Sequence, residues 1–485
     1  MFDVSRREFL RYGAMLSAAG SVAAPLAAAD PKPAKRGSAN ERLRVAVVGV
    51  RSRGMSHVGG FVGGKKNAAQ NTIITHVCDA DEGVIGKAMT QVEADQGSAP
   101  KFVQDYRKLI ENPDIDVISI ATPNHWHALM AVLAMRAGKD VYVEKPVSHN
   151  VREGRLIVEA SAKYGKICQT GTQSRSMLGM RQAIEYVHSG KIGDVNLAYG
   201  TCYKDRKTLG KVNGVQPTPK TMDYDLWCGP ARVIAPTRKS VHYDWHWIWE
   251  YGNGDLGNQG IHEMDKARWG LGVAQLPESV VSVGGRFGYV DDGETANTQV
   301  CLYDFGGKKL IFEVRGLPTK DFRGSQVGNV FVGSEGYVVC PSYHSGVVYD
   351  KDGKKVTEFK GGGEESHFAN FVKAVRSRKR TDLHADILEG HLSSALCHLG
   401  NISYRLGAET TFEKDVGAMA DCPEAADAVK RMREHLTENK VDLAKAVGRV
   451  GVKLGIDPKT ETFTGNNPSA QAMLFREYRK GFEIA

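Results

Sequence analysis

The chain has 485 residues, of which 41% are hydrophobic and 25% are charged, and its formal net charge is +8. This length allows two conventional domains, and the composition excludes a disordered or collagen-like protein. The net charge is modest and part of it lies in the N-terminal region, so we expect no nucleic-acid partner. The eight cysteines form no C-x-x-C pair, which argues against a zinc ribbon or a redox dithiol.

The first 29 residues show the features of a targeting segment in order. Arg6-Arg7 and Phe9-Leu10 precede a mildly apolar stretch rich in Ala, Gly and Ser, and three alanines at 27–29 offer a cleavage site. This order is similar to a twin-arginine export signal, so we expect an exported, periplasmic protein with residues 30–41 as a linker. No other segment approaches the ~20 apolar residues needed to cross a bilayer, so we expect no membrane span.

A short buried strand, 43–48, runs into a turn that contains glycine. Gly49 and Gly54 occupy the outer positions of the dinucleotide-binding pattern G-x-G-x-x-G, but Arg51 stands at its middle glycine. Backbone N–H groups at the start of the following helix can hold a pyrophosphate, and Arg51 or Arg53 can add charge-assisted hydrogen bonds to it. The alternative is an ordinary turn with solvent-facing arginines.

A second strand, 72–78, ends at Asp79. A carboxylate at this position would bind the ribose hydroxyls of an adenine dinucleotide and repel a 2′-phosphate, which favours NAD over NADP. Asp81 is a competing candidate for this role. The arginine in the turn leaves NADP open as an alternative cofactor.

Residues 116–147 show a strand, a helix and a second strand. The first strand ends at Thr122-Pro123-Asn124, and the second ends at Glu144-Lys145-Pro146. Because ligands collect at the carboxyl ends of parallel strands, both ends should open onto one crevice. An ammonium such as that of Lys145 can stabilise negative charge that develops on a reacting oxygen. A structural ion pair between Lys145 and Glu144 is the alternative.

The second half of the chain contains β-rich runs separated by Gly, Asp and Pro clusters, as is typical of antiparallel strands. These runs are 195–203, 280–289, 295–305, 309–314, 327–332 and 337–340. Two helical segments follow, 367–378 and 386–406. Residues 411–485 look like an appended C-terminal arm.

An aromatic cluster occupies residues 243–251. As a strand, it would turn Trp245, Trp247 and Trp249 to one side and His246 to the other. Indole rings pack well on the C–H faces of sugars, so we expect His246 and one tryptophan, Trp247, near a substrate. Packing in the core or between subunits is the alternative for these rings.

The best candidate for a general base is His262. It is spaced i, i+4 from Asn258, which would put both on one face of a helix. A histidine titrates near neutrality and can take a hydroxyl proton while the carbon loses hydride. A histidine satisfied at a helix end is the alternative. The His-rich segments 125–127 and 242–246 lack the spacing that would complete a metal site, so we expect no metal.

Four motifs together resemble the Gfo/Idh/MocA family of glucose-fructose oxidoreductase, inositol dehydrogenase and MocA: ATPNHWH, VYVEKP, QTGTQSR and GDLGNQGIHEMDKARW. The resemblance implies an α/β fold, with an N-terminal Rossmann domain at 42–166 and a C-terminal α/β domain at 167–410. It also implies a large open antiparallel sheet that builds a homo-oligomer. The implied activity is NAD(P)-dependent hydride transfer on a small carbohydrate or polyol.

The resemblance also implies site residues. Lys145 would be the catalytic lysine that orients the nicotinamide, and His262 the base. Asn258 stands where sugar and inositol dehydrogenases usually carry an aspartate, so Asp255 or Asp265 is the candidate replacement, and we place Asp265 at the substrate. The residues implied to contact the cofactor are Thr122, Pro123, Asn124, His127, Glu144, Lys145, Gln173 and Arg175.

Export would constrain the reaction, because little free NAD exists outside the cytoplasm. We therefore expect a tightly held cofactor that is recycled within each catalytic cycle. In one such chemistry, a sugar is oxidised and a second carbonyl compound is reduced. In another, used by NAD-dependent glycosidases of this fold, transient oxidation of a ring hydroxyl permits elimination of the anomeric group. A dinucleotide-binding protein without turnover is a further alternative, supported by Arg51 and Asn258.

Overall fold

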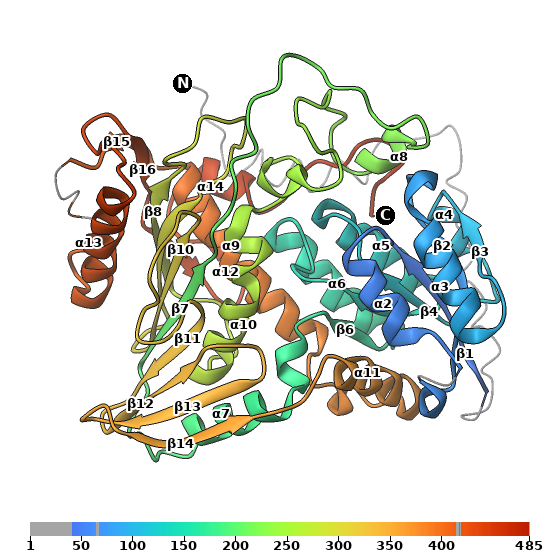
Figure 1. Cartoon of the computed structure of the whole chain (residues 1–485), viewed down its shortest axis with the longest axis horizontal. Helices are drawn as coiled ribbons and strands as arrows, with labels where there is room; N and C mark the ends of the chain where they lie inside the picture. The colour runs from blue at the N-terminus through green and yellow to red at the C-terminus, as the bar shows by residue number, and fades with distance from the viewer. Residues whose placement is uncertain (1–40, 65–66, 414–416, 418, 485) are drawn as a thin grey trace. The chain divides into compact units, whose positions relative to one another are not determined.

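The computed structural model describes residues 41–484, apart from residues 65–66, 414–416 and 418 (Figure 1). The predicted export signal, residues 1–29, and the predicted linker up to residue 40 lie outside the described part. Within that part, no helix is long and apolar enough to cross a membrane. All eight cysteines are described, and each is buried and free.

The N-terminal half is built around a six-stranded sheet in which all neighbouring strands are parallel. The strand order is β3-β2-β1-β4-β5-β6, so it reverses between β1 and β4, where ligands bind in folds of this type. The strands are β1 (Leu43–Val48), β2 (Thr72–Cys78), β3 (Lys101–Val103), β4 (Val117–Ile120), β5 (Asp140–Val143) and β6 (Cys168–Thr170).

Helices cover both faces of this parallel sheet, as its continuously apolar strands require. α5 and α6 pack on one face, and α2 and α3 pack on the other. α11 belongs to the C-terminal half of the sequence, yet its side chains join the same hydrophobic cluster as α2. The helices are α2 (Arg53–Phe61), α3 (Gly86–Gln96), α4 (Arg107–Ile110), α5 (Asn124–Arg136), α6 (Val151–Tyr164) and α11 (Glu365–Ser377).

The first domain extends beyond its predicted end at residue 166. β6 pairs with β5 and completes the parallel sheet, so the predicted boundary between 42–166 and 167–410 is wrong at this point. Only three residues form β6, and their pairing with β5, rather than a local pattern, defines the strand.

The C-terminal half contains a twelve-stranded sheet, drawn in green to red in Figure 1. Its main path runs β14-β13-β12-β11-β7-β10-β9-β8-β16-β15, and β17 pairs with β8 and β18. The strands are β7 (Leu197–Tyr203), β8 (Ser279–Gly285), β9 (Thr298–Asp304), β10 (Lys309–Arg315), β11 (Val327–Val332), β12 (Gly336–Cys340), β13 (Ser345–Asp350), β14 (Lys355–Lys360), β15 (Ala408–Thr411), β16 (Val447–Val450), β17 (Leu454–Asp457) and β18 (Thr462–Phe463).

This large sheet is mixed, whereas the expected sheet was wholly antiparallel. β7 and β10 pair in parallel, whereas the other described pairs of the sheet are antiparallel. The parallel pair is possible because a long connection separates the two strands in the chain, and hairpin connections alone cannot produce it.

One face of the large sheet packs on helices that separate it from the Rossmann half (Figure 1). α10 contacts β7 and β11, while α12 contacts both β8 and α6. These helices therefore join the two halves of the described chain. They are α7 (Leu178–His188), α9 (Gly254–Asn258), α10 (Gly260–Leu271) and α12 (Ile387–Arg405).

The opposite face, predicted to be open, is partly covered by α13 (Pro423–Glu438). Met432 and Leu436 of this helix join the hydrophobic cluster formed by β8, β9 and β10. Arg431 forms an ion pair with the buried Glu313 of β10. The face that the sequence assigns to subunit contacts is thus occupied there by a helix of the same chain.

Residues 411–485 are integrated into the fold rather than appended as an arm. β16 and β17 pair with β8, and α14 (Pro468–Ala472) leads into a final segment that returns to the Rossmann half. There the ring of Phe482 packs edge-on against Trp126 of α5, with ring centroids 5.6 Å apart.

Candidate active site

A cleft of about 320 Å³ opens at the carboxyl ends of β1, β4 and β5. Gly49 lines this cleft, and the turn runs from Gly49 to Gly54. Gly49 has a φ of +81°, and a Cβ there would lie 2.7 Å from the backbone of Ala121; a Cβ on Gly54 would lie 1.7 Å from the carbonyl oxygen of Gly49. Ser52, at the N-cap of α2, makes no side-chain capping bond. The first N–H groups of α2 are therefore available to an anion in the cleft.

Asp79 lies in the cleft directly after β2. Its carboxylate accepts hydrogen bonds from the backbone N–H groups of Val50, at 3.0 Å, and Asp81, at 3.1 Å. Burial raises the pKa of Asp79, and these two bonds oppose the rise. The side chain of Asp81 is instead bonded to Thr221 and to His242 at 2.8 Å. The structure therefore favours Asp79 as the carboxylate that meets the ligand.

The segment after β4 forms the next wall of the cleft, to which Thr122, Pro123, Asn124 and His127 all contribute. The ring nitrogens of His127 lie 2.8 Å from the carbonyl oxygen of Thr122 and 2.6 Å from that of Pro146. His127 therefore ties the end of β4 to the end of β5. Asn124 donates a hydrogen bond of 3.0 Å to Asn253.

Glu144 pairs with Arg53 rather than with Lys145. Its carboxylate accepts hydrogen bonds from Nε of Arg53 at 2.7 Å and lies 3.1 Å from Nε2 of His57. Arg53 also pairs with Glu364, so its guanidinium is engaged by carboxylates, contrary to its predicted role at a pyrophosphate. Arg51 is exposed and lines the cleft. Among the turn arginines, Arg51 remains the candidate phosphate ligand.

Lys145 reaches across the cleft toward the second half of the chain. Its ammonium donates a hydrogen bond of 2.7 Å to the carbonyl oxygen of Asn258. Burial lowers the pKa of Lys145, and the charge of Glu144 opposes the shift. Nζ of Lys145 therefore lies at the cleft and is held there by a carbonyl oxygen of the protein. A substrate oxygen can take the place of this carbonyl oxygen as the hydrogen-bond acceptor.

His262 is buried near Lys145 but does not share a helix with Asn258, contrary to prediction. Asn258 ends α9 and His262 lies in α10, although Gln259 between the two helices keeps right-handed helical backbone angles (φ −92°, ψ −46°). Burial, together with the charge of Lys145, holds the pKa of His262 well below its usual value. The imidazole is therefore neutral near pH 7. Its ring packs against Tyr343, with ring centroids 4.7 Å apart.

The aromatic segment forms a 3-10 turn, Asp244–Trp247, and not a strand. Trp245 and His246 face the cleft together, stacked with ring centroids 3.7 Å apart. Nδ1 of His246 donates to the carbonyl oxygen of Tyr243 at 2.6 Å, since a carbonyl can only accept, and burial lowers the pKa of His246 to about 3. Nε2 is therefore an unprotonated acceptor.

Besides Gly54 and His262, four predicted site residues lie outside the cleft lining. Trp247 is buried, with the guanidinium of Arg206 over its ring at 5.6 Å. Arg175 forms two hydrogen bonds with Asp265, at 2.8 and 2.9 Å, and both side chains are buried. Gln173 is likewise buried away from the cleft. The Arg175–Asp265 pair thus stabilises the packing of α10 and does not meet a ligand in the described structure.

The structure adds residues that the sequence did not single out. Lys204 follows β7 and donates a hydrogen bond of 3.0 Å to Gln259. Arg206 pairs with Asp255 at 2.7 Å. Lys204, Arg206 and Gln259 all line the cleft. The only local signal for the two basic residues is their position at the end of a β-rich run, which by itself indicates nothing about a ligand.

These features define an α/β dinucleotide-binding protein, because the glycine turn, open helix start and Asp79 together fit a dinucleotide at the sheet switch point. Residues 43–172 match the family model "Oxidoreductase family, NAD-binding Rossmann fold", and residues 194–438 match "Oxidoreductase family, C-terminal alpha/beta domain". The chain belongs to the Gfo/Idh/MocA oxidoreductase family. Its cofactor is NAD.

Two curated relatives carry glycosidase names. A glycosyl hydrolase family 109 protein of Saccharopolyspora erythraea is 34% identical over 221 residues, which cover 42% of this chain and 47% of the relative. An alpha-N-acetylgalactosaminidase of Shewanella oneidensis is 30% identical over 190 residues, or 35% of this chain and 39% of the relative. The chain thus matches less than half the length of these relatives.

Solved structures share the fold at low identity. The WlbA dehydrogenase from Bordetella pertussis, in complex with NADH and UDP-GlcNAcA, has 19% identity and a TM-score of 0.53, covering 73% of this chain and 94% of that one. Levoglucosan dehydrogenase, in complex with NADH and levoglucosan, has 18% identity and a TM-score of 0.56, covering 74% and 97%.

Proposed function

We propose that the protein is an NAD-dependent oxidoreductase that acts on a carbohydrate or polyol by hydride transfer. The observation that carries this proposal is the position of Lys145, whose ammonium lies at the dinucleotide cleft with a neutral histidine, His246, on the same cleft and another, His262, nearby. Hydride transfer requires a cation at the reacting oxygen and a base for its proton.

Bound NAD would supply the hydride acceptor and, in the reverse direction, the hydride donor. Gly49, Gly54 and Asp79 would hold it, with Arg51 at the phosphates. Lys145 would transfer its hydrogen bond from the carbonyl of Asn258 to the substrate oxygen and stabilise negative charge there. Glu144 supports the ammonium form of Lys145 from the other side, since its charge opposes the lowering of the Lys145 pKa by burial.

The substrate hydroxyl must lose its proton to a group that is unprotonated near pH 7. His262 meets this condition because burial and the charge of Lys145 lower its pKa. His246 meets it as well, and its unprotonated Nε2 belongs to a side chain on the cleft wall. We propose His262 as the base and His246 as a substrate-binding group that can share the proton.

A second candidate function is an NAD-dependent glycosidase, and the glycosidase names of two relatives favour it. Transient oxidation of a ring hydroxyl would acidify the neighbouring C–H, and loss of that proton would expel the anomeric group. Addition of water and return of the hydride would then restore the ring. The cofactor would end each cycle as NAD, so no external oxidant is consumed.

We also propose that the protein is exported by the twin-arginine route, with its cofactor already bound and recycled within each catalytic cycle, and that it is a homo-oligomer. The Arg6-Arg7 segment supports export. To test retention, the protein would be purified from its native export route and denatured, and the released dinucleotide would be identified by mass spectrometry. An empty protein without affinity for NAD would contradict the retained cofactor, and a loaded protein without turnover would indicate a binding protein. NADP in place of NAD would overturn the preference assigned to Asp79.

The two chemistries differ in their products when no NAD is added. Purified protein would be incubated with glycosides and polyols, and either release of the aglycone or an oxidised sugar with a reduced acceptor would be measured. Lys145→Ala and His262→Ala should each lower the rate at least a hundredfold, roughly the contribution of one positioned general acid–base group. Wild-type rates in the double variant would show that the site assignment is wrong.

A further inference from the structure

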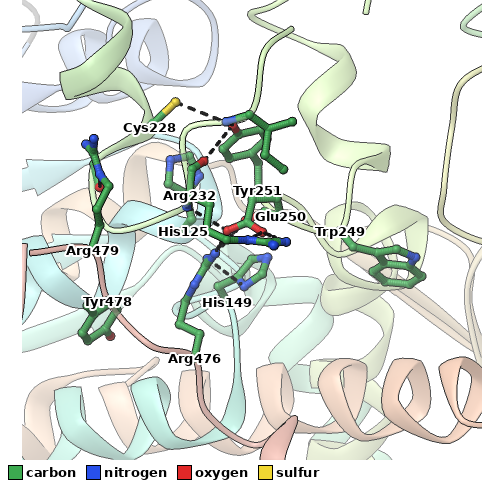
Figure 2. Close-up of polar contacts among 12 residues, drawn as sticks. His125, His149, Cys228, Arg232, Trp249, Glu250, Tyr251, Arg476, Tyr478 and Arg479 are labelled. Carbon is green, nitrogen blue, oxygen red and sulfur yellow. Dashed lines mark hydrogen bonds and ion pairs between the residues drawn. The ribbon is translucent and has the colours of Figure 1, made fainter. Parts of the chain in front are cut away.

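A second cavity, of about 210 Å³, lies between the loop that follows Lys145 and the C-terminal segment. His149 and Asn150 line it from the loop, Arg405 from the end of α12, and Arg476 from the C-terminal segment. Figure 2 shows Arg476 rising from that segment toward Glu250 and His149. The cavity has no part in the hydride-transfer site described above.

Three buried donors in this cavity have no acceptor within the described residues. Nδ1 of His149 accepts from Nη1 of Arg476 at 3.3 Å, so Nε2 carries the hydrogen, and Nε2 has no partner. The side-chain oxygen of Asn150 accepts from the N–H of Glu153, which leaves its amide nitrogen unpaired. Nε of Arg476 is also unpaired. Buried donors without acceptors are unfavourable and uncommon in native structures.

Arg405 adds a positive charge at the same cavity. Its guanidinium makes no hydrogen bond or ion pair with the described residues, and it stands over the ring of Trp249 at 4.8 Å. The acidic residue of the lining, Glu250, already pairs with Arg232 at 2.7 Å and with Arg476. The cavity therefore presents donors and positive charge for which the described residues supply no acceptor.

We propose that this cavity binds a small oxyanion, the carboxylate or phosphate group of a ligand distinct from the substrate. An oxyanion offers several acceptor lone pairs, enough for Nε2 of His149, the amide of Asn150 and the two arginines together. The ligand would link the C-terminal segment to His149 and Asn150, which lie in the loop that follows Lys145. Sugars without an acidic group would bind this cavity more weakly, because they bring no charge to Arg405.

The test uses the full-length protein with saturating NAD, so that the phosphate cradle of the dinucleotide is filled. Inorganic phosphate, acetate and glucuronate would be titrated at constant ionic strength, with binding followed by calorimetry. We compare wild type with Arg405→Gln, which removes an exposed charge without breaking a hydrogen bond, and with His149→Leu. Lys445→Gln is the matched control, because it removes one positive charge from an exposed side chain on a different part of the surface.

The expected result is saturable binding of at least one oxyanion, weakened on the order of tenfold in Arg405→Gln and in His149→Leu and unchanged in Lys445→Gln. The preferred probe would then identify the group as carboxylate or phosphate. Absence of saturable binding to the wild type would overturn the proposal. Equal affinity of wild type and Arg405→Gln would also overturn it, because the anion would then bind elsewhere. Neither outcome bears on hydride transfer at Lys145.

Discussion

Replacing Gly54 with alanine should disrupt the dinucleotide cradle. The added Cβ would lie 1.7 Å from the carbonyl oxygen of Gly49, about 1.6 Å closer than an ordinary C···O contact of roughly 3.3 Å. The carbonyl cannot retreat easily, because the N–H of Gly49 is bonded to Cys78 and its Cα already faces the backbone of Ala121. The start of α2 must therefore move.

The cost can be stated for both folding and binding. Overpacking of this kind costs about 1–3 kcal/mol, and a similar loss in cofactor binding corresponds to roughly a tenfold to hundredfold weaker Kd for NAD. Isothermal titration of NAD into protein freed of its cofactor would measure the binding change, and urea unfolding would measure the stability change. Gly86→Ala is the matched control, because, apart from its chain neighbours and the backbone of its own helix, no atom of the described residues lies within 4 Å of its added Cβ.

If Gly54→Ala bound NAD within twofold of the wild type, the turn at Gly49 would not be the pyrophosphate cradle. A loss of affinity shared by Gly86→Ala would point instead to general damage from the substitutions.

Three further predictions concern other parts of the structure. Glu144→Gln should lower the free energy of unfolding by about 2 kcal/mol at neutral pH. Burial raises the pKa of Glu144, but the charge of Arg53 and the hydrogen bond from His57 outweigh burial and hold this pKa well below the usual 4.5. In urea unfolding, the difference in stability between wild type and variant should therefore shrink as the pH falls below 4.5. Met432→Ala should cost about 2–5 kcal/mol, because α13 covers the large sheet; a loss below about 0.5 kcal/mol, typical of a surface residue, would contradict this packing. Asp79→Asn should raise the affinity for NADP relative to NAD on the order of tenfold in parallel titrations, and an unchanged ratio would show that another residue sets the preference.

Much of the Rossmann half could be predicted from sequence, since its signals are local. The strand ends at Asn124 and Lys145 were identifiable because buried apolar runs stop there, and the structure brings both to one cleft. Asp79 was similarly marked by its place after β2. By contrast, the ends of β6 could not be predicted, because its three residues become a strand only through pairing with β5.

Which partner a charged side chain meets depends on which distant segments of the chain pack against it, and local sequence patterns do not encode that packing. Arg53 was predicted at a phosphate, but the end of β5 brings Glu144 to it at 2.7 Å. Arg175 was predicted at the cofactor, and α10 instead places Asp265 against it. The Arg175 side chain is buried and that of Arg53 is half-buried. A guanidinium removed from water needs a carboxylate nearby, and only the packing of distant segments determines which carboxylate it meets.

The sequence by itself determined that a dinucleotide turn, an acidic residue and a lysine each follow a buried strand (β1, β2 and β5), because hydrophobic periodicity and strand ends are properties of neighbouring residues. The tertiary structure decided the rest. It broke the helix between Asn258 and His262, turned His246 and not Trp247 to the cleft, and laid α13 over the sheet predicted to be open. Each of these outcomes depends on burying apolar surface between segments far apart in the chain, and that choice is made only when the whole core assembles.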